Sequence, residues 1–278
     1  MKQFKLIGFY ILIALIIYYI SYLITINKIN HINKILEYSL MVNLLNDDVS
    51  KDRLQNIENI YGKLGLNINI EKALHWREDE LELKTLPLDK YNIDTKKGRS
   101  KNIRPGAYGL AGSLYKCIKK AKGYDYPHLI FFEDDAIPLI KNKYKFYDEF
   151  INVINTIPDS GDGIYFLAIT VPECAISPKG PGKIYALRFK DLKQEGWKQS
   201  KLLDDAWGAH AIYFTKKGID NVYNHLQRKK MDKPIDVWLR HKFKCWYYTN
   251  NVNDDGFFMG LFEQYNTFCE SRINTLDN

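Results

Sequence analysis

The stretch "HLIFFEDDAIPL", His128 to Leu139, joins an apolar run directly to three consecutive acids, Glu133, Asp134 and Asp135. A short apolar run of this kind predicts a buried strand. Three like charges at its end repel one another and are costly to desolvate. No lysine or arginine adjoins them to neutralise the charge. The stretch therefore indicates a cation site, with a solvated acidic turn, in which Asp135 caps the next segment, as the alternative.

Strands and helices alternate along the rest of the chain. Besides the acidic stretch, the apolar pattern predicts strands at 40–45, 67–74, 163–169 and 209–215. Helical periodicity predicts helices at 50–65, 105–122, 144–154, 216–226 and 234–243, whereas 77–103 is patternless and predicted as a loop. This alternation predicts an α/β fold with a mostly parallel sheet flanked by helices. Ligands of such sheets bind beyond the carboxyl ends of the strands, which is where the three acids lie.

Three glycines occur in the helix predicted at 105–122: Gly106, Gly109 and Gly112. Glycine weakens a helix, but it lets another backbone or a ligand come close. We therefore expect a close approach along this helix.

The N-terminal segment from Leu6 to Ile26 contains no charged residue. At about 1.5 Å per residue it matches the roughly 30 Å of a bilayer core. A cleaved signal peptide is the alternative, but its apolar core is shorter and ends in a small-x-small site that is missing here. We expect a single-pass membrane protein with an anchor at 1–27, a stalk at 28–39 and one domain at 40–278. Lysines on both sides of the span leave its orientation open.

Bulk composition excludes some classes of protein. The chain has 278 residues, of which 46% are hydrophobic, enough for a large core. The net charge of +7 is spread along the chain without a dense basic arm, so we do not expect a nucleic-acid partner. The four cysteines are far apart and form no CxxC pair, so a zinc site of that type is not expected.

The acidic stretch suits a particular kind of cation. Glu133 and Asp135 are separated by one residue, and alternate side chains of an extended segment share a side. Carboxylate oxygens are preferred by hard cations, so we expect Mn²⁺ (or Mg²⁺) held by these two residues. Such an ion clamps the phosphates of a nucleotide and stabilises a departing diphosphate.

Five segments, in order, resemble glycosyltransferase family 25, the lipooligosaccharide and collagen-type sugar transferases. They are "MVNLLNDDVSKDRLQNI", "RPGAYGLAGSL", "LIFFEDDA", "WGAHAIYFTKKGI" and "PIDVWL", and together they span about residues 40–240. Two positions depart from the pattern of the family. Its glycine-rich segment has a glutamate and a histidine where this chain has Ala107 and Leu114.

The resemblance implies a GT-A-like fold and an inverting transfer of a sugar from a nucleotide-sugar, a UDP-hexose, to a glycan, glycolipid or glycoprotein. Inversion requires a general base, and the late aspartate of the family matches Asp236. Asp204 and Asp205 are second choices for this base. The resemblance also implies donor contacts for Asn43, Arg53, Gly106, Glu133 and Asp134, and acceptor contacts for Trp207 and Gly208.

Each of these roles has a plainer alternative. Asp236 equally suits the start of a helix, where the dipole favours an acid. Arg53 suits an exposed helix position, and Trp207 a core or loop. His210 could be a ligand of the metal or the donor, but a packed strand position suits a histidine there better. For the whole chain, the alternatives are a metal-dependent phosphoesterase and an inactive, anchored carbohydrate-binding or scaffold protein. Location would be a secretory-pathway membrane with type II topology, or a bacterial inner membrane.

Overall fold

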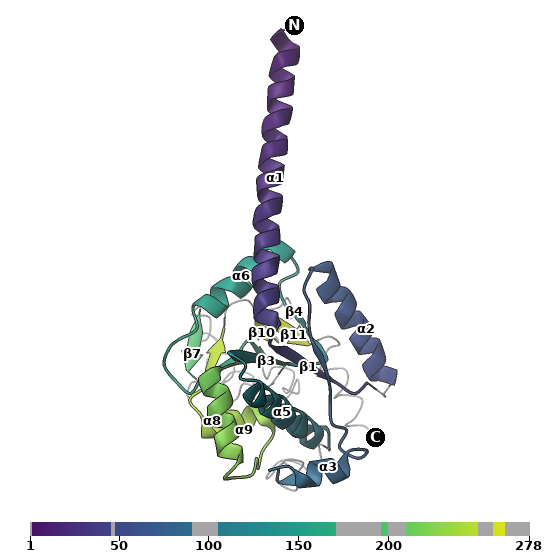
Figure 1. The fold of residues 1–278 in the computed structure, drawn as a ribbon, viewed down its shortest axis with the longest axis vertical. Coiled ribbons are helices and arrows are strands. Elements are labelled where there is room, and N and C mark those ends of the chain that lie inside the picture. The colour runs from purple at the N-terminus through teal and green to yellow at the C-terminus, as the bar shows by residue number, and fades with distance from the viewer. Residues whose placement is uncertain are drawn as a thin grey trace, which may run out of the picture.

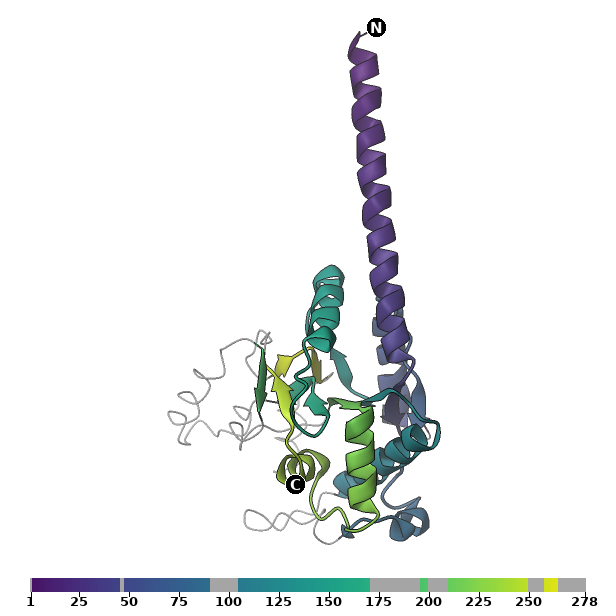
Figure 2. The ribbon, with the colours of Figure 1, turned by 60° about the vertical axis from the view of Figure 1, so that its left-hand side comes forward.

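The computed structural model describes residues 2–45, 48–90, 105–170, 196–199, 210–249 and 258–264. It has a mixed α/β fold, with helices on both sides of a seven-stranded sheet (Figure 1). Helix α1 (Lys2–Leu36) projects far beyond the rest of the molecule (Figures 1 and 2).

The order of strands in the sheet is β2 (Ile70–Lys72), β1 (Ser39–Asn43), β3 (His128–Glu133), β8 (Ala211–Thr215), β5 (Ile164–Phe166), β9 (Trp246–Tyr248) and β7 (Trp197–Gln199). Strand β1 runs parallel to β2 and β3, and β5 runs parallel to β9. Strand β8 is antiparallel to both of its neighbours, and β7 is antiparallel to β9. Strands β2, β1, β3, β5 and β9 therefore share one direction, and β8 and β7 run against them, so the sheet expected to be mostly parallel is a mixed sheet. The sequence did not show the two reversed strands, because an apolar run shows that a strand is buried but not in which direction it runs.

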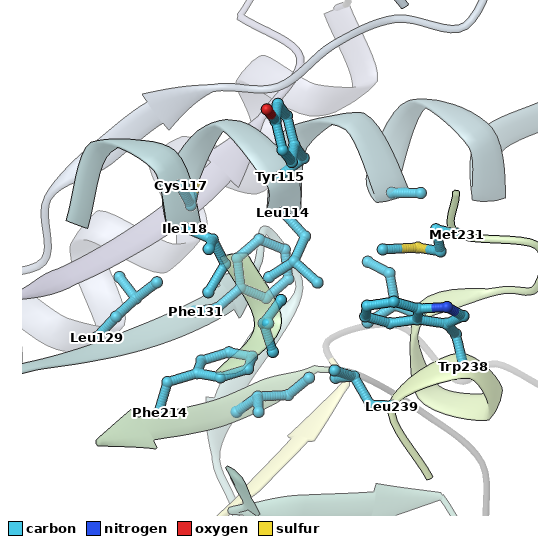
Figure 3. Close-up of a cluster of buried hydrophobic side chains, with 14 of the residues drawn as sticks. Leu114, Tyr115, Cys117, Ile118, Leu129, Phe131, Phe214, Met231, Trp238 and Leu239 are labelled. Carbon is cyan, nitrogen blue, oxygen red and sulfur yellow. The ribbon is translucent and has the colours of Figure 1, made fainter. Parts of the chain in front are cut away.

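Both faces of the sheet are buried. In β3, Leu129 and Phe131 belong to one hydrophobic cluster, and Ile130 and Phe132 to the other. The first cluster is covered by α5 (Pro105–Gly123), α8 (Lys216–Leu226) and α9 (Ile235–Lys242). Figure 3 shows the side chains that α5 and α9 contribute. The second is covered by the end of α1, by α2 (Asp48–Lys63) and by α6 (Lys143–Asn155). Strands buried on both faces read as continuous apolar runs, which is why the sequence located them.

Two predicted segments differ in detail. The apolar run 163–169 divides between β5 and β6 (Ala168–Thr170), and β6 pairs with β10 (Phe258–Gly260) in a separate two-stranded sheet. A second small sheet joins β4 (Ala136–Pro138) to β11 (Phe262–Gln264). The predicted loop contains a short helix, α3 (Glu80–Thr85), whose Leu83 is buried. A helix of only six residues offers too little periodicity to be seen in a sequence.

The glycines of α5 confirm the expected close approach. A β-carbon at Gly109 would overlap the carbonyl oxygen of Leu74, and one at Gly112 would overlap the side chain of Leu83. Ser113 Oγ accepts a hydrogen bond from the Leu74 amide at 2.8 Å, which fixes the same contact. Leu114 is 0% exposed and lies within the core (Figure 3). This part of α5 is therefore shaped by packing.

Helix α1 has two different halves. Its large apolar side chains are exposed from Ile7 to Ile24, whereas Ile32 and Leu36 are buried in the domain. By length and composition, Phe9–Leu36 could cross a membrane. The segment predicted as a stalk, 28–39, is helical as far as Leu36, and Asn33 Nδ2 donates a hydrogen bond to the carbonyl of Gly65 at 2.9 Å.

Candidate metal and active site

The pairing of β3 with β8 brings Glu133 and His210 together. The Glu133 amide donates to the His210 carbonyl at 3.0 Å, so the two residues lie opposite each other on neighbouring strands. Because β8 is antiparallel, the residue before its start lies at the same edge as the end of β3. Their side chains meet there, with His210 Nδ1 3.5 Å from Glu133 Oε2.

Asp135 completes a group of three side chains that could hold a metal ion. One ligand atom from each of Glu133, Asp135 and His210 lies within 4.8 Å of the others. Asp135 Oδ1 is buried and has no hydrogen-bond partner among the residues that the structure describes. A buried carboxylate oxygen in that state is costly unless a cation or a proton satisfies it. Two carboxylates and one imidazole form a donor set that fits Mn²⁺.

The electrostatics of the group indicate excess negative charge. Burial, followed by the charge of Glu133, raises the pKa of Asp135 to about 7. Burial alone would lower the pKa of His210, but the hydrogen bond and charge of Glu133, with the charges of Asp135 and Asp236, outweigh it and raise the pKa. Both raised pKa values mean that the group of Glu133, Asp135 and His210 favours an added proton. A divalent cation would neutralise the same negative charge.

Asp134 turns away from this group toward two other predicted residues. Asn43 Nδ2 donates to Asp134 Oδ2 at 2.9 Å, and an Arg53 terminal guanidinium nitrogen lies 3.5 Å from Asp134 Oδ1. Burial raises the pKa of Asp134, and the charge of Arg53 opposes that rise. These contacts fasten the end of β1 and helix α2 to the acidic turn. Donor contacts for the three residues remain predictions.

Asp236 lies in the first turn of α9 and is half-buried. Its negative charge contributes to the raised pKa of His210. It also contributes, after burial, to the raised pKa of Tyr247, at the end of the neighbouring strand β9. The late aspartate of the sequence is therefore within electrostatic range of the Glu133–Asp135–His210 group.

The other predicted site residues fall into two sets. Gly106 is exposed in the first turn of α5, and a β-carbon there would have no neighbour within 4 Å. Outside the described residues lie Trp207, Gly208, Asp204 and Asp205. The sequence left His210 between a packed strand residue and a ligand. In the structure His210 is 3% exposed and its side chain faces the acids. Its place beside Glu133 follows from the antiparallel direction of β8, so knowing that direction would have identified His210 as a candidate ligand.

Comparison with known proteins adds little to this geometry. No protein-family model matches the chain, and no curated protein matches it. Among solved structures, a crystal structure of the galactosyltransferase LgtC in complex with donor and acceptor sugar analogs is similar in part. The match has a TM-score of 0.31 and 8% sequence identity, and covers 77% of this chain and 74% of that chain. A likeness this slight carries no argument about function.

Proposed function

We propose that the protein is a membrane-anchored, metal-dependent glycosyltransferase that moves a hexose from a UDP-sugar to a glycan, glycolipid or glycoprotein, with inversion. The observation that carries this proposal is the group Glu133, Asp135 and His210 at one edge of the sheet, with Asp236 in electrostatic range. The five ordered segments that resemble family 25 supply the substrate class. Helix α1 supplies the anchor.

In this proposal Glu133, Asp135 and His210 hold Mn²⁺ (or Mg²⁺). The bound ion would neutralise charge on the diphosphate leaving group. Asp134, held by Asn43 and Arg53, keeps the acidic turn in position. The Arg53 side chain is 37% exposed, which leaves its guanidinium accessible to a phosphate of the donor.

Asp236 is the proposed general base. In an inverting displacement, the acceptor oxygen attacks the anomeric carbon while the bond from that carbon to the diphosphate breaks. The proton of the acceptor hydroxyl then passes to the carboxylate. A half-buried carboxylate in the first turn of a helix is held in place, yet accessible from one side. Trp207 and Gly208 are proposed to contact the acceptor, and Gly106 the donor.

Donor hydrolysis by the purified full chain tests the proposal. The chain in detergent is incubated with a panel of nucleotide-sugars, with Mn²⁺ or with EDTA, and released nucleotide is measured. We expect hydrolysis of a UDP-hexose that requires the metal and is lost in a Glu133→Gln/Asp135→Asn double variant. Binding of Mn²⁺ and UDP without release of nucleotide, even when acceptors are supplied, would leave an inactive carbohydrate-binding protein.

A metal-dependent phosphoesterase is the second candidate. Sites of that class draw acids and histidines from different strands, and His210 joins the acids here from outside β3. Assays with p-nitrophenyl phosphate and with UDP distinguish the two. Release of inorganic phosphate from these compounds, without cleavage of any nucleotide-sugar, would favour the phosphoesterase.

A further inference from the structure

The exposed part of α1 ends close to the point where the domain begins. Large apolar side chains are exposed from Ile7 to Ile24, a rise of about 26 Å, close to the roughly 30 Å of a bilayer core. Just beyond this part, Lys28 forms an ion pair with Asp148 of α6, and Ile29 packs near Gly65. Lys28 lies only about 6 Å of helical rise beyond Ile24, which is about the depth of one headgroup layer.

Several contacts hold the end of α1 against the domain. Ile32 and Leu36 are in the core, and the Ile35 carbonyl is 2.8 Å from His128 Nε2. Asn33 contacts the 65–67 turn through two hydrogen bonds. If α1 spans a membrane, the end of the domain nearest Lys28 is therefore held beside the lipid headgroups.

That end of the domain carries the start of α6 (Figures 1 and 2). Lys141, Lys143 and Lys145 (the α6 lysines) are exposed there, and so is Tyr144. Phe146 and Phe150 of α6 are buried in the core, so Tyr144 and Lys145, which lie on other sides of the helix, face away from it. Lys143 is exposed as the first residue of the helix. The acids of α6 are Asp148, which pairs with Lys28, and Glu149, which accepts a hydrogen bond from Tyr248. With the three α6 lysines and Lys28 counted against these two acids, this end of the domain has a net positive charge.

We infer that the α6 lysines and Tyr144 bind anionic phospholipid headgroups of the membrane that α1 crosses. Basic side chains next to a membrane span are attracted to anionic lipid, and tyrosine is favoured at the interface. Lys143 Nζ lies 5.1 Å from the centre of the Tyr144 ring, so charge and ring present one surface. The inference rests on the anchor in the proposed function, not on the reaction. Binding of headgroups by α6 would be a second attachment to the membrane, besides α1, and would set the orientation of the domain relative to the membrane.

Amine labelling of the full chain in lipid nanodiscs tests the inference. Discs of phosphatidylcholine alone are compared with discs that also contain phosphatidylglycerol, and labelling at each lysine is followed by mass spectrometry. In anionic discs we expect labelling of the α6 lysines to slow by on the order of fivefold, and high salt to abolish the difference. Lys229 and Lys230, exposed beyond the far end of α8, are the internal control and should label equally in both discs.

A pair of variants separates docking from a general effect of the lipid. In Lys143→Gln/Lys145→Gln, the protection of Lys141 should disappear, whereas Lys229→Gln/Lys230→Gln should retain it. Equal labelling of the α6 lysines in both kinds of disc overturns the inference while α1 remains anchored. Release of the chain from natural membranes by alkaline carbonate instead overturns the anchor, and the inference with it. Neither result bears on the test of sugar transfer.

Discussion

A histidine lies at each end of β3, half-buried His128 at its start and buried His210, opposite Glu133, at its end, and their pKa values are shifted in opposite directions. At the start of the strand, burial lowers the pKa of His128, and its hydrogen bond to the Ile35 carbonyl only partly opposes this. At the other end, burial also acts to lower the pKa of His210, but the neighbouring carboxylates reverse the outcome. Burial therefore acts in the same direction at both ends, and the partners decide the result. The His128 end is built for packing, whereas the Glu133 end concentrates negative charge as a binding site does.

The largest effect is expected for Asp236→Asn. Loss of the proposed base should lower sugar transfer by about 10²–10⁴-fold, because the base acts only when an acceptor hydroxyl attacks. Affinity for UDP with Mn²⁺ and the melting temperature should stay near the parent values. Asp220→Asn on α8, which loses an ion pair with Lys122, is the control and should transfer normally. A variant that mainly melts earlier would show Asp236 to be a structural cap.

Asp135→Asn should weaken Mn²⁺-dependent binding of UDP by at least about tenfold, because it removes a charged ligand from the metal group. In EDTA, binding should be weak in both proteins. Calorimetric titration with UDP in Mn²⁺ and in EDTA measures the difference. Unchanged affinity in Mn²⁺ would remove Asp135 from the metal site.

The same substitution should stabilise the metal-free protein. Asp135 is half-buried, with its Oδ1 atom fully buried, and it lies beside Glu133 and Asp134. Loss of its charge should therefore relieve repulsion by about 1 kcal/mol or more, a rise of a few degrees in melting temperature. Asp134→Asn is the matched control. Its carboxylate is bound by Asn43 and Arg53, so it should gain less or lose stability. Thermal melts in EDTA decide the matter, and a less stable Asp135→Asn protein would contradict the account of excess charge.

The smallest effect concerns the packing end of β3. The folded-state pKa of His128 is below its ordinary value, so between the two values the unfolded chain binds a proton that the folded chain does not. Stability should fall as the pH falls through that window, by no more than about 1.4 kcal/mol per pH unit. His128→Gln keeps a donor for the Ile35 carbonyl but cannot titrate in this range. Melts at about pH 7.5 and about pH 5.5 should differ less in the variant than in the parent.

His225, which also has a lowered pKa, is present in both proteins and cancels from this comparison. Equal pH dependence of parent and variant would show that His128 contributes nothing.

Much of the fold followed from local pattern. Apolar runs located β1, β3 and β8 because these strands are buried on both faces, and α8 has the predicted bounds, Lys216–Leu226. The acids at the end of β3 were also visible, since charge after an apolar run needs no tertiary knowledge. The direction of β8 could not be predicted, because an apolar run does not show whether a strand is parallel or antiparallel to its neighbours. His210 depends on that direction.

Ala107 and Leu114, the two positions that depart from the pattern that the sequence otherwise resembles, show the same limit. From the sequence, Ala107 and Leu114 could have altered a ligand contact. In the structure Leu114 is fully buried and Ala107 packs against the same cluster, so both serve the core. A residue pattern cannot show which side of a helix meets a neighbour until the neighbour is known. Leu83 and Leu74, which occupy the space beside Gly112, come from segments far away in the sequence.

The unbroken passage of α1 into the core has a mechanical consequence. Because α1 is one continuous helix whose last turns are packed in the core, a tilt of its exposed part should tilt the domain with it. A helix in a bilayer adjusts its tilt to the thickness of the hydrocarbon layer around it. If α1 spans a membrane, the angle between the membrane plane and the Glu133 edge of the sheet would therefore change with the thickness of the bilayer.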